Sequence, residues 1–490
     1  MESRLIALVT FVVLTVTGFS QPASFYKVFS GNGYDEAQGL TQLPDSSYLI
    51  TGSSSSFENA PNQAFLMNID KQGNYLWSKA YGGAEFEEGK RVFSVDNFGH
   101  YVIGTSNSDV SHNFDAYVFF TDPAGELQWE KWFDYGSWER VHSAIMLPDT
   151  SLVAVAETDS TVNGNTDFYM FRLDKNGDML WSKKWGSDGD DLPKSINIVS
   201  DTTFVISGTE YVADSLTNKG YVGYFKNDGT VLWDSTYCGN GWAQINDIHY
   251  YENVLRGIGQ RKIAGHEFWD YYNLDLDLNG NLLSDSYFNT GTGNGRFTHY
   301  VQYTAAVDKF FVIRQVEDAG FPTYPGGEDN ICSRYTSQFY WDASDAGYSN
   351  GGQDNVNQII ATKDGYAAFV GSHEYYCCGG SSLFIVKIGD DSNYPYNTTN
   401  PTVYDMVGVE ENIELLNVSA YPNPFQNEVS VDLPEGETVQ IMVYNQLGQE
   451  LETFENQSGT VLLKTNNYPK GMYFFKISSE NGTATLRLVK

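Results

Sequence analysis

Residues Asp174–Gly186 read DKNGDMLWSKKWG, and related stretches return along the chain at a fixed interval. They are DKQGNYLWSKAYGG from Asp70, DPAGELQWEKWF from Asp122, KNDGTVLWDSTYCG from Lys226 and a weaker DLNGNLLSDSYFN from Asp277. The tryptophans of these stretches are 52 residues apart, at Trp77, Trp129, Trp181 and Trp233. A regular period of roughly 40–50 residues with strand-like content is typical of propeller arrays. The repeat therefore predicts an all-β fold, a β-propeller whose tryptophans pack between adjacent blades.

Each repeat has room for four short strands separated by turns. In Glu87–Phe133, alternating apolar residues predict strands at Lys90–Val95, His100–Thr105, Ala116–Thr121 and Leu127–Phe133. Turns of the type Asp-x-x-Gly between such strands suit tight hairpins. Four antiparallel strands of this kind form one propeller blade.

Seven such units can be placed along the chain. Their first strands are expected at Glu36–Leu43, Lys90–Val95, Val141–Leu147, Lys194–Val199, Gln244–Tyr250, His299–Ala306 and Val356–Thr362. The last unit has a third strand, Leu383–Ile388, but no fourth, whereas Phe25–Ser30 lies at a fourth-strand position ahead of the first unit. We expect Phe25–Ser30 to complete the last blade and close the ring, which removes exposed sheet edges. The sixth unit is irregular, with an insertion around Ala319–Arg334 and a degenerate fourth strand.

The bulk composition excludes several classes of function. The chain has 490 residues, enough for more than one domain, and a formal net charge of −33. So acidic a surface repels nucleic acid and anionic lipid, whereas it attracts divalent cations or basic partners. Acidity that serves only solubility is the simpler explanation. The 4 cysteines are too few for a disulfide scaffold and form no CxxC zinc pattern.

The N-terminal sequence MESRLIALVTFVVLTVTGFS, residues 1–20, has the features of a signal peptide. Arg4 precedes a short apolar segment, Leu5–Val16, and the small residues Gly18 and Ser20 precede a cut before Gln21. The apolar segment is short for a membrane span, so a retained anchor is the weaker alternative. No other stretch is expected to cross a bilayer. The mature chain is therefore expected to enter an oxidising compartment.

The composition changes near residue 391. We expect the propeller over residues 21–391, a linker over 392–416 that is rich in Asn, Thr and Pro, and a second module over 417–490. The module is expected to be a small β-sandwich with a strand at Ile441–Tyr444 and a turn at Gln446–Gln449. Tyr473 and Phe475 share one face of a strand by period-two alternation. The motifs of the module are AYPNPF from Ala420, YNQLGQ from Tyr444 and KGMYF from Lys470, followed by the final Lys490.

In this order at the end of the chain, these motifs resemble the type A C-terminal sorting domain of type IX secretion in Bacteroidota. The match is carried by Tyr421, Pro422, Asn423, Pro424, Gly448, Gly471, Tyr473 and Lys490. The resemblance implies an address that the outer-membrane translocon reads, often removed when the cargo is released or attached to surface lipopolysaccharide. It implies a secreted or cell-surface protein that passes through the periplasm and has the type IX sorting machinery as its partner. An accessory sandwich that only stabilises the chain is the alternative.

The repeated hairpin, Asp-x-x-Gly-x-x-Leu-Trp, is similar to the repeats of pyrroloquinoline-quinone-type propellers. This resemblance covers most of Phe25–Asp391. Because such repeats serve many functions, it supports the fold and not an activity.

An acidic residue recurs just before the first strand of five units, at Asp35, Glu87, Glu139, Asp191 and Asp354. Because the innermost strands of a propeller line its axis, these carboxylates are candidate ligands for Ca²⁺ or another hard cation, which prefers oxygen. The alternative is that each acid accepts hydrogen bonds from its own loop, as repeated local structure would require. Ala243 and Thr298 take this position in the fifth and sixth units, which breaks a full ring.

Three cysteines are expected in loops of the last two units. Cys332 lies in the insertion of the sixth unit, and Cys377 and Cys378 lie in the corresponding loop of the seventh. A bond from Cys332 to one of the pair would restrain a long loop. A disulfide between Cys377 and Cys378 is the alternative. Quinoprotein dehydrogenases have such an adjacent pair at their cofactor, but seven units instead of eight and no recognisable ligand set for quinone or calcium weaken that resemblance.

Aromatic residues are concentrated in or beside the loops that join second to third and fourth to first strands. They are Trp138, Trp242, Phe268, Trp269, Phe321, Tyr324, Tyr375 and Tyr376. Aromatic rings on such a loop face can stack on sugars, and this face usually carries function in propellers. The alternative is that the rings form small cores over the blade ends. The candidate ligand-binding residues are Trp138, Glu139, Asp191, Trp242, Trp269, Tyr375 and Tyr376.

No catalytic residue is assigned, because the sequence has neither an HExxH zinc motif nor a P-loop. The first hypothesis is a secreted or surface-attached module that binds a glycan or a protein without turnover. The second is an enzyme that acts on extracellular polysaccharide, a glycoside hydrolase or a lyase, with its site around Asp191 and Glu139. The third is a structural component of a surface layer.

Overall fold

The computed structural model describes residues 24–490 except 58–61, 110–112, 137, 160–163, 239–240, 264–268, 289–294, 303–308, 318–327, 337–340, 349–353, 375–380, 389–401, 406–417, 434–437, 446–449 and 480–482. The chain divides into two compact units, Met1–Met406 and Val407–Lys490. Strands dominate both units, and the one helix among the described residues is a single 3₁₀ turn at Ala213–Ser215. The all-β prediction is therefore confirmed.

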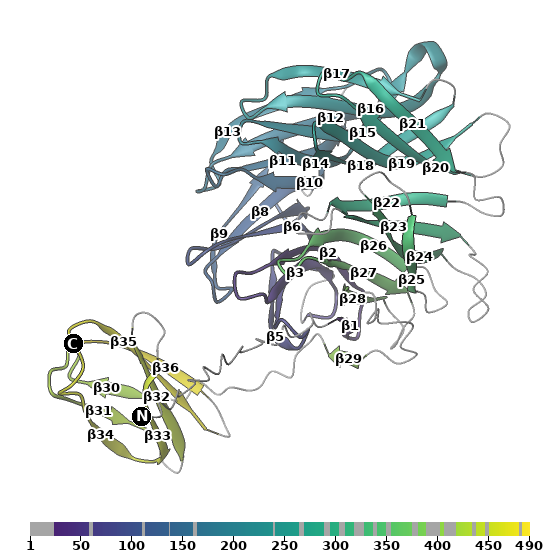
Figure 1. Ribbon diagram of the computed structural model, residues 1–490. Coiled ribbons are helices and arrows are strands. Elements are labelled where there is room, and N and C mark those ends of the chain that lie inside the picture. Colours follow the sequence, from purple (N-terminus) through teal and green to yellow (C-terminus); the bar gives the residue numbers. More distant parts are fainter. Residues whose placement is uncertain are drawn as a thin grey trace, which may run out of the picture. The chain divides into compact units, whose positions relative to one another are not determined.

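The first unit consists of antiparallel sheets in which four consecutive strands pair in chain order, as in propeller blades (Figure 1). The first strands are β2 (Asp35–Gln42), β6 (Glu87–Val95), β10 (Glu139–Met146), β14 (Leu192–Ser200), β18 (Trp242–Tyr251), β22 (Gly295–Gln302) and β26 (Asp354–Ala361). The second strands are β3 (Tyr48–Ser54), β7 (Gly99–Ser106), β11 (Leu152–Asp159), β15 (Thr203–Val212), β19 (Val254–Lys262), β23 (Lys309–Glu317) and β27 (Ala367–Glu374). The third strands are β4 (Gln63–Ile69), β8 (Asp115–Thr121), β12 (Thr166–Leu173), β16 (Thr217–Lys226), β20 (Asp270–Leu276), β24 (Glu328–Thr336) and β28 (Ser381–Lys387). The fourth strands are β5 (Tyr75–Tyr81), β9 (Leu127–Phe133), β13 (Met179–Trp185), β17 (Val231–Tyr237), β21 (Leu282–Phe288) and β25 (Trp341–Tyr348).

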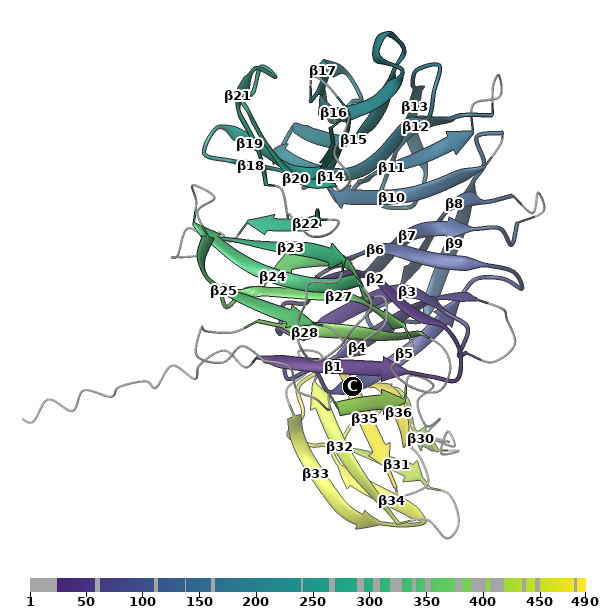
Figure 2. The ribbon, with the colours of Figure 1, turned by 90° about the vertical axis from the view of Figure 1, so that its right-hand side faces the viewer.

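The last sheet takes its fourth strand from the start of the described chain. β1 (Phe25–Ser30) pairs antiparallel with β28, and the two strands lie side by side in Figure 2. β29 (Thr402–Asp405) adds a parallel strand on the other side of β1. These four residues fall within the predicted linker, so that part of it is a strand. Val403 and Tyr404 favour this conformation, and the pairing covers the edge of β1.

The repeated turn explains the repeated tryptophan. In the turn between β8 and β9, Gly125 has a φ of 78°, a backbone conformation that favours glycine. The ring of Trp77, from the preceding sheet, lies so close that a Cβ on Gly125 would come within 2.7 Å of it. Phe25 of β1 lies in the same way against Gly73 of the first sheet, 2.8 Å from such a Cβ. The prediction that these rings pack between adjacent sheets is confirmed, and Phe25 takes the role of the tryptophan for the last sheet.

The first strands lie innermost and contact one another from sheet to sheet. Contacts join β2 to β6, β6 to β10, β10 to β14, β14 to β18, β18 to β22, β22 to β26 and β26 to β2. Between β26 and β2, Asn357 donates to the Ala37 carbonyl at 2.9 Å and the Leu40 N–H donates to Gln358 Oε1 at 2.6 Å. Apolar clusters fill the space between neighbouring sheets, as Leu66 and Phe119 do between the first and second.

The sixth sheet is more regular than the sequence predicts. The fourth strand that was expected to be degenerate is β25, and the last seven residues of the expected insertion, Glu328–Arg334, belong to β24. Cys332 therefore lies in a strand, opposite Ile313 and Ala346, and the prediction that it lies in a loop is wrong. Ile331 and Tyr335 have high strand propensity, which outweighs the irregular spacing of this unit.

The second unit has two sheets around one core. Their strands are β30 (Ser419–Tyr421), β31 (Glu428–Asp432) and β34 (Thr460–Lys464) in one sheet, and β33 (Glu450–Gln457), β32 (Val439–Asn445), β35 (Met472–Ser478) and β36 (Thr483–Val489) in the other. Val431 of the first sheet and Ile441 of the second are fully buried in the shared core. Tyr473 and Phe475 are 3% and 0% exposed in that core, so their predicted common face is confirmed.

Candidate functional site

Four of the predicted carboxylates lie at one edge of the sheets, where first and third strands begin and second and fourth strands end. We call this the acid edge. Asp35, Glu87, Glu139 and Asp191 are all 0% exposed. The Asp35 carboxylate accepts hydrogen bonds from Gly31 N at 2.7 Å, Ser54 Oγ at 2.5 Å and Ser56 Oγ at 3.0 Å. All three donors belong to the same sheet or to the loop that leads into it, so the carboxylate fixes that loop.

The other three acids are held in the same local way. Glu139 accepts from Thr158 Oγ1 at 2.8 Å and Tyr135 N at 3.2 Å. Asp191 accepts from Tyr211 N at 2.7 Å and from Ser187. Burial raises the pKa of Glu87, Glu139 and Asp191, although these hydrogen bonds act in the opposite direction.

The remaining positions of the predicted ring differ from sheet to sheet. Asp354 begins β26, and its side chain lies outside the described residues. Ala243 takes the position in β18, as predicted. In β22 the register shift between Phe297 and His299 places Gly295 there, so the assignment of Thr298 to this position is wrong. The register shift lies three residues after this position in every first strand, so it aligns Gly295 with Asp35 and Glu87. The irregular spacing of the sixth unit had displaced the assignment by three residues.

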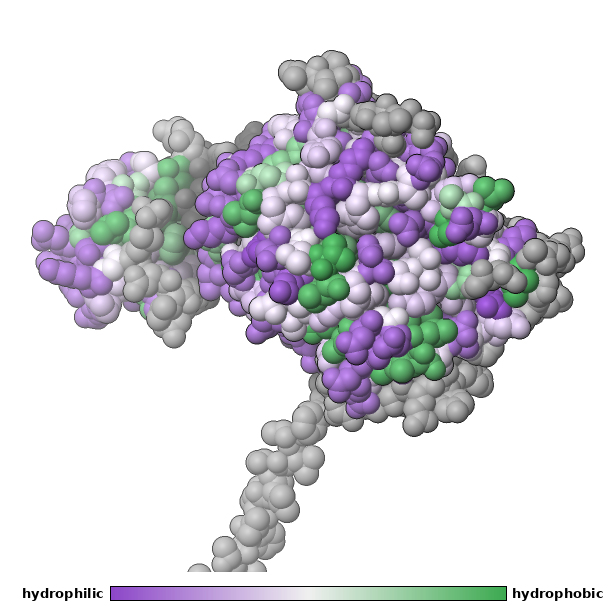
Figure 3. Space-filling view, turned by 90° about the horizontal axis from the view of Figure 1, so that it is seen from above, coloured by the Kyte–Doolittle hydropathy of each residue, from purple (hydrophilic) through white to green (hydrophobic). Residues whose placement is uncertain are grey.

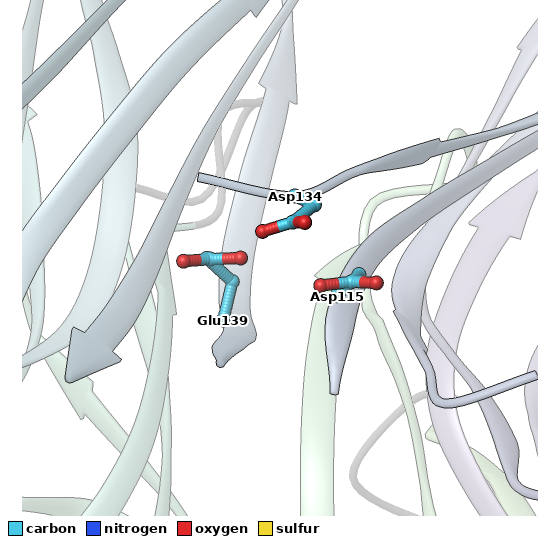
Figure 4. Close-up of side chains that lie close together, drawn as sticks. All are labelled: Asp115, Asp134 and Glu139. Carbon is cyan, nitrogen blue, oxygen red and sulfur yellow. The ribbon is translucent and has the colours of Figure 1, made fainter. Parts of the chain in front are cut away.

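Glu139 also belongs to a small cluster of acids. Carboxylate oxygens of Asp115, Asp134 and Glu139 lie within 4.8 Å of one another, and the three side chains converge from β8, the loop after β9 and β10 (Figure 4). Burial, followed by the neighbouring Asp109, raises the pKa of Asp115 to about 7. A hard cation would suit these oxygens. Without one, the raised pKa keeps a proton in the cluster near neutral pH.

The Asp115 carboxyl is expected to make the protein less stable as the pH rises. Its folded pKa of about 7 lies above the unfolded value, so the folded chain binds more protons between roughly pH 4 and 7 and loses stability across that range. Asp115→Asn is expected to raise the free energy of unfolding by about 1–3 kcal/mol at pH 8 and by less at pH 5. Urea unfolding at both pH values measures this, with Asp188→Asn as control, because Asp188 is exposed and lies outside the cluster. If Ca²⁺ stabilised the wild type and Asp115→Asn abolished that effect, the prediction would be contradicted and the cluster would be a cation site.

A pocket of about 550 Å³ lies at the acid edge between the second and third sheets. It is lined by Phe86, Thr105, Asn113, Phe114, Trp138, Arg140 and Glu157, and we call it the Trp138 pocket. Trp138 is half-buried just before β10, and the rings of Phe86 and Phe114 meet edge to face with centroids 5.6 Å apart. An amide, a guanidinium and a carboxylate thus lie beside three aromatic rings, the composition of a site for a partly polar ring-shaped ligand.

The pocket contains one residue that the sequence singles out, Trp138, and several that it does not. Phe86 and Phe114 are single apolar residues in loops, which gave no reason to choose them over others. Arg140 and Glu157 sit opposite each other on β10 and β11. Burial raises the pKa of Glu157, but contacts with His142 and nearby cations outweigh it and leave that pKa lowered, so this carboxylate is charged.

The other predicted aromatic candidates are not in this pocket. Trp242 and Trp269 meet edge to face at a centroid distance of 4.6 Å beside β18, and Lys262 Nζ lies 5.5 Å from the centroid of Trp269. These rings pack on each other at the acid edge of another sheet. Phe268, Phe321, Tyr324, Tyr375 and Tyr376 lie outside the described residues.

The cysteine pairings stay predictions. Cys377 and Cys378 lie outside the described residues, and of Cys332 only the backbone position in β24 is described. Cys238 is a buried free thiol in the core between the fourth and fifth sheets, and burial raises its pKa. It packs there as a small apolar side chain.

The predicted sorting motif divides into buried and exposed residues. Tyr473 is buried and donates through its hydroxyl to the Pro469 carbonyl at 2.6 Å, and the Lys490 N–H donates to the Gly471 carbonyl at 2.9 Å. Asn423 Oδ1 accepts from Val489 N at 2.9 Å, so the opening segment of the unit holds its last strand. Tyr421, Pro422, Asn423 and Pro424 are exposed, and Gly448 lies outside the described residues.

The face seen in Figure 3 is mostly hydrophilic, with small and separate apolar patches. In the part of the chain that the structure describes, no helix is long and apolar enough to cross a membrane.

Comparison with known proteins identifies the second unit. Residues 419–490 match the family described as secretion system C-terminal sorting domain. No curated protein matches the chain. Among solved structures, the chain is similar to PorZ, an essential surface component of the type-IX secretion system of Porphyromonas gingivalis, with 10% identity and a TM-score of 0.42 over 94% of this chain. The match spans 59% of the length of PorZ.

Two further structures are similar over the first unit. One is an ulvan lyase of polysaccharide lyase family PL25, at 10% identity and a TM-score of 0.48 over 74% of this chain and 97% of that chain. The other is the β-propeller domain of the Trilobed protease from Pyrococcus furiosus, at 8% identity and a TM-score of 0.40 over 77% and 97%. Likenesses this distant carry no argument about function. What is identified is the C-terminal part: residues 419–490 are a type IX secretion C-terminal sorting domain, which directs this chain to the cell surface or to secretion.

Proposed function

We propose that residues 25–388 form a seven-bladed β-propeller closed by the N-terminal strand. Three contacts support this: β1 pairs with β28, Phe25 packs against the turn at Gly73, and Asn357 and Gln358 of β26 hydrogen-bond β2. A ring closed in this way leaves no inner strand without a neighbour. The acid edge of every blade then faces the same side, where loops of neighbouring blades meet.

We propose that this exported propeller is a recognition module that binds a glycan in the Trp138 pocket. The observation that carries the proposal is the lining of that pocket, in which Phe86, Phe114 and Trp138 stand beside an amide, a guanidinium and a charged carboxylate. Aromatic faces cover the apolar side of a sugar ring, and the polar groups bond its hydroxyls. A pocket of about 550 Å³ suits a ligand of one or two sugar rings.

Recognition without turnover accounts for the described site better than hydrolysis or lyase chemistry. The enzyme hypothesis uses Glu139 and Asp191, and both carboxylates are fully buried and bonded within their own sheets. A general acid or base needs to reach its substrate within hydrogen-bond distance. Glu157 is the carboxylate that lines the pocket. Its pKa is lowered, so at neutral pH it is charged and accepts hydrogen bonds, and it has no proton to donate.

Trp138→Ala is expected to weaken glycan binding by about tenfold, equal to about 1.4 kcal/mol, because it removes a stacking ring from the pocket. The measurement is calorimetric titration of the full mature chain with glycans first selected on an array. Trp242→Ala is the matched control, since Trp242 is also half-buried at the acid edge but does not line the pocket. If Trp242→Ala weakened binding and Trp138→Ala did not, the glycan site would lie beside Trp242 in the fifth sheet and not in the Trp138 pocket.

A further inference from the structure

A β-bulge interrupts the first strand of each sheet of the first unit at the same place. The register shifts at Ala37/Gly39, Gly89/Arg91, Val141/Ser143, Pro193/Ser195, Ile245/Asp247, Phe297/His299 and Val356/Gln358. The residues that these bulges set apart are Gln38, Lys90, His142, Lys194, Asn246, Thr298 and Asn357. All of them are polar, although Val141 and Ile245 next to two of them are buried. A polar residue therefore occupies the bulge position of all seven innermost strands.

Three of these residues, in consecutive sheets, are basic, and two of the three have acidic neighbours. Lys90 donates to Gln38 Oε1 at 2.9 Å and lies 3.8 Å from Glu88 Oε1. His142 Nε2 lies 3.4 Å from Glu157 Oε2. Lys194 differs, because no hydrogen bond or ion pair engages its ammonium group among the described residues.

Arg140 is a second cation without a direct partner. Its side chain has no hydrogen bond or ion pair within the described part of the chain, and it lines the Trp138 pocket. Lys194 lines a second cavity of about 220 Å³, which residues of β6, β10, β14, β18 and β26 surround. Burial is the largest cause of the lowered pKa of Lys194. The charge of Glu157 opposes this effect, and the charges of Lys90 and Arg140 add to it.

Positive charge is therefore concentrated where the innermost strands meet, in a chain whose net charge is −33. Acids offset part of this charge. Glu88 lies beside Lys90, and Asp247 lines the same cavity as Lys194. The Glu157 carboxylate lies beside His142, and its charge also acts on Arg140 and Lys194. Burial and the neighbouring Glu88 raise the pKa of Glu36, which favours its uncharged form. An anion that approaches this protein is repelled at long range, so a bound anion needs a local cationic site of this kind.

We propose that Arg140 and Lys194 bind the acidic group, a carboxylate or a sulfate, of a saccharide whose ring packs in the Trp138 pocket. The inference rests on the proposed function and names its substrate class, an acidic glycan. The guanidinium of Arg140 has paired N–H donors that can bind two oxygens of a carboxylate or of a sulfate at once. The ammonium group of Lys194 adds a compact positive charge. Lys194 is half-buried, which strengthens its contact over one in open water, whereas Arg140 is exposed.

The test compares an acidic and a neutral oligosaccharide of equal length, a tetramer of galacturonic acid and a tetramer of galactose, by calorimetric titration of the full mature chain. Thermal unfolding measured in sulfate and in chloride, at equal ionic strength, tests the anion site without any sugar. The variants are Arg140→Gln and Lys194→Met, which keep most of the side-chain volume. Lys175→Met is the matched control, an exposed lysine at the opposite edge whose loss changes the net charge equally.

We expect the acidic tetramer to bind about tenfold more tightly than the neutral one, and each variant to weaken the acidic tetramer alone by about tenfold. We also expect sulfate to protect the wild type and Lys175→Met more than Lys194→Met. Equal binding of both tetramers, unchanged in the variants, would overturn the acidic specificity and leave the glycan site standing. If sulfate stabilised the wild type but not Lys194→Met, and neither tetramer bound, the anion site would stand and the glycan function would be overturned. Neither binding nor protection would overturn both.

Discussion

Phe29→Ala is expected to lower the free energy of unfolding of the first unit by about 3–5 kcal/mol, one of the two largest effects that we anticipate. Phe29 is fully buried in β1, in a core that contains Phe65 of the first sheet and Ile385 of the last. The preceding residue, Val28, faces a different core with Phe369. A strand of six residues thus stabilises the contact between the last sheet and the first. The cavity left by the phenyl ring weakens that contact directly.

Urea unfolding followed by tryptophan fluorescence measures this loss. Tyr34→Ala is the control, because Tyr34 follows β1 closely but is 65% exposed. We expect no more than about 0.5 kcal/mol of change there. Equal stability of the two variants would show that β1 does not hold the last sheet in solution, and would overturn the proposed closure by the N-terminal strand.

Much of the fold could be predicted because one local contact repeats. Each tryptophan of the 52-residue repeat packs on the glycine turn of the next sheet, so the two residues must recur together. Phe25 fits the same spacing, which is why β1 could be placed in the last sheet from sequence alone. The sixth sheet could not be placed as well, because its turns lack this pair. Strand propensity around Cys332 then decided its structure against the apparent insertion.

The candidate site was predictable only in part, for a reason that lies in the first strands. Trp138 was found because it is an aromatic residue beside a loop that joins a fourth strand to a first strand. Arg140 and Lys194 were missed because alternating polar residues usually indicate the solvent face of a half-buried strand. In a propeller that alternation also marks the side turned to the axis, and a bulge common to all sheets leaves the 52-residue spacing unchanged. Period and pattern therefore cannot distinguish an inner polar group from an outer one.

The repeated acids show the opposite case, in which the residues were found and their surroundings were not. Asp35, Glu139 and Asp191 recur because each begins a strand and accepts hydrogen bonds from the loop before it or from the neighbouring second strand. The donors Ser54 and Thr158 lie 19 residues from their acids in sequence, on another strand, whereas Ser187 lies 4 residues before Asp191. Spacing alone gives the position of such an acid but not whether its oxygens are already occupied.

Removal of residues 419–490 is expected to abolish delivery of the chain to the cell surface, because these residues are its sorting domain. The deleted chain is expected to stay inside the cell envelope with its first unit folded, since the two units are separately compact. Fractionation of cells followed by immunoblotting measures the distribution. Normal surface delivery of the deleted chain would contradict the assignment of residues 419–490 as the export signal.

Two point variants decide whether the machinery needs the folded unit or only its motifs. Phe475→Ala removes a fully buried ring at a cost of about 3–5 kcal/mol, which is a large part of the stability of so small a unit. Leu462→Ala, at a side chain that is 55% exposed in the same unit, is the matched control. Both leave Tyr421–Phe425 and Gly471 unchanged. We expect Phe475→Ala to reduce surface delivery strongly and Leu462→Ala to leave it normal, because the exposed prolines and the clamped C-terminal strand keep their arrangement only on a folded core. Full delivery of Phe475→Ala, with the unit shown to be unfolded, would mean that the motifs are read as an extended segment.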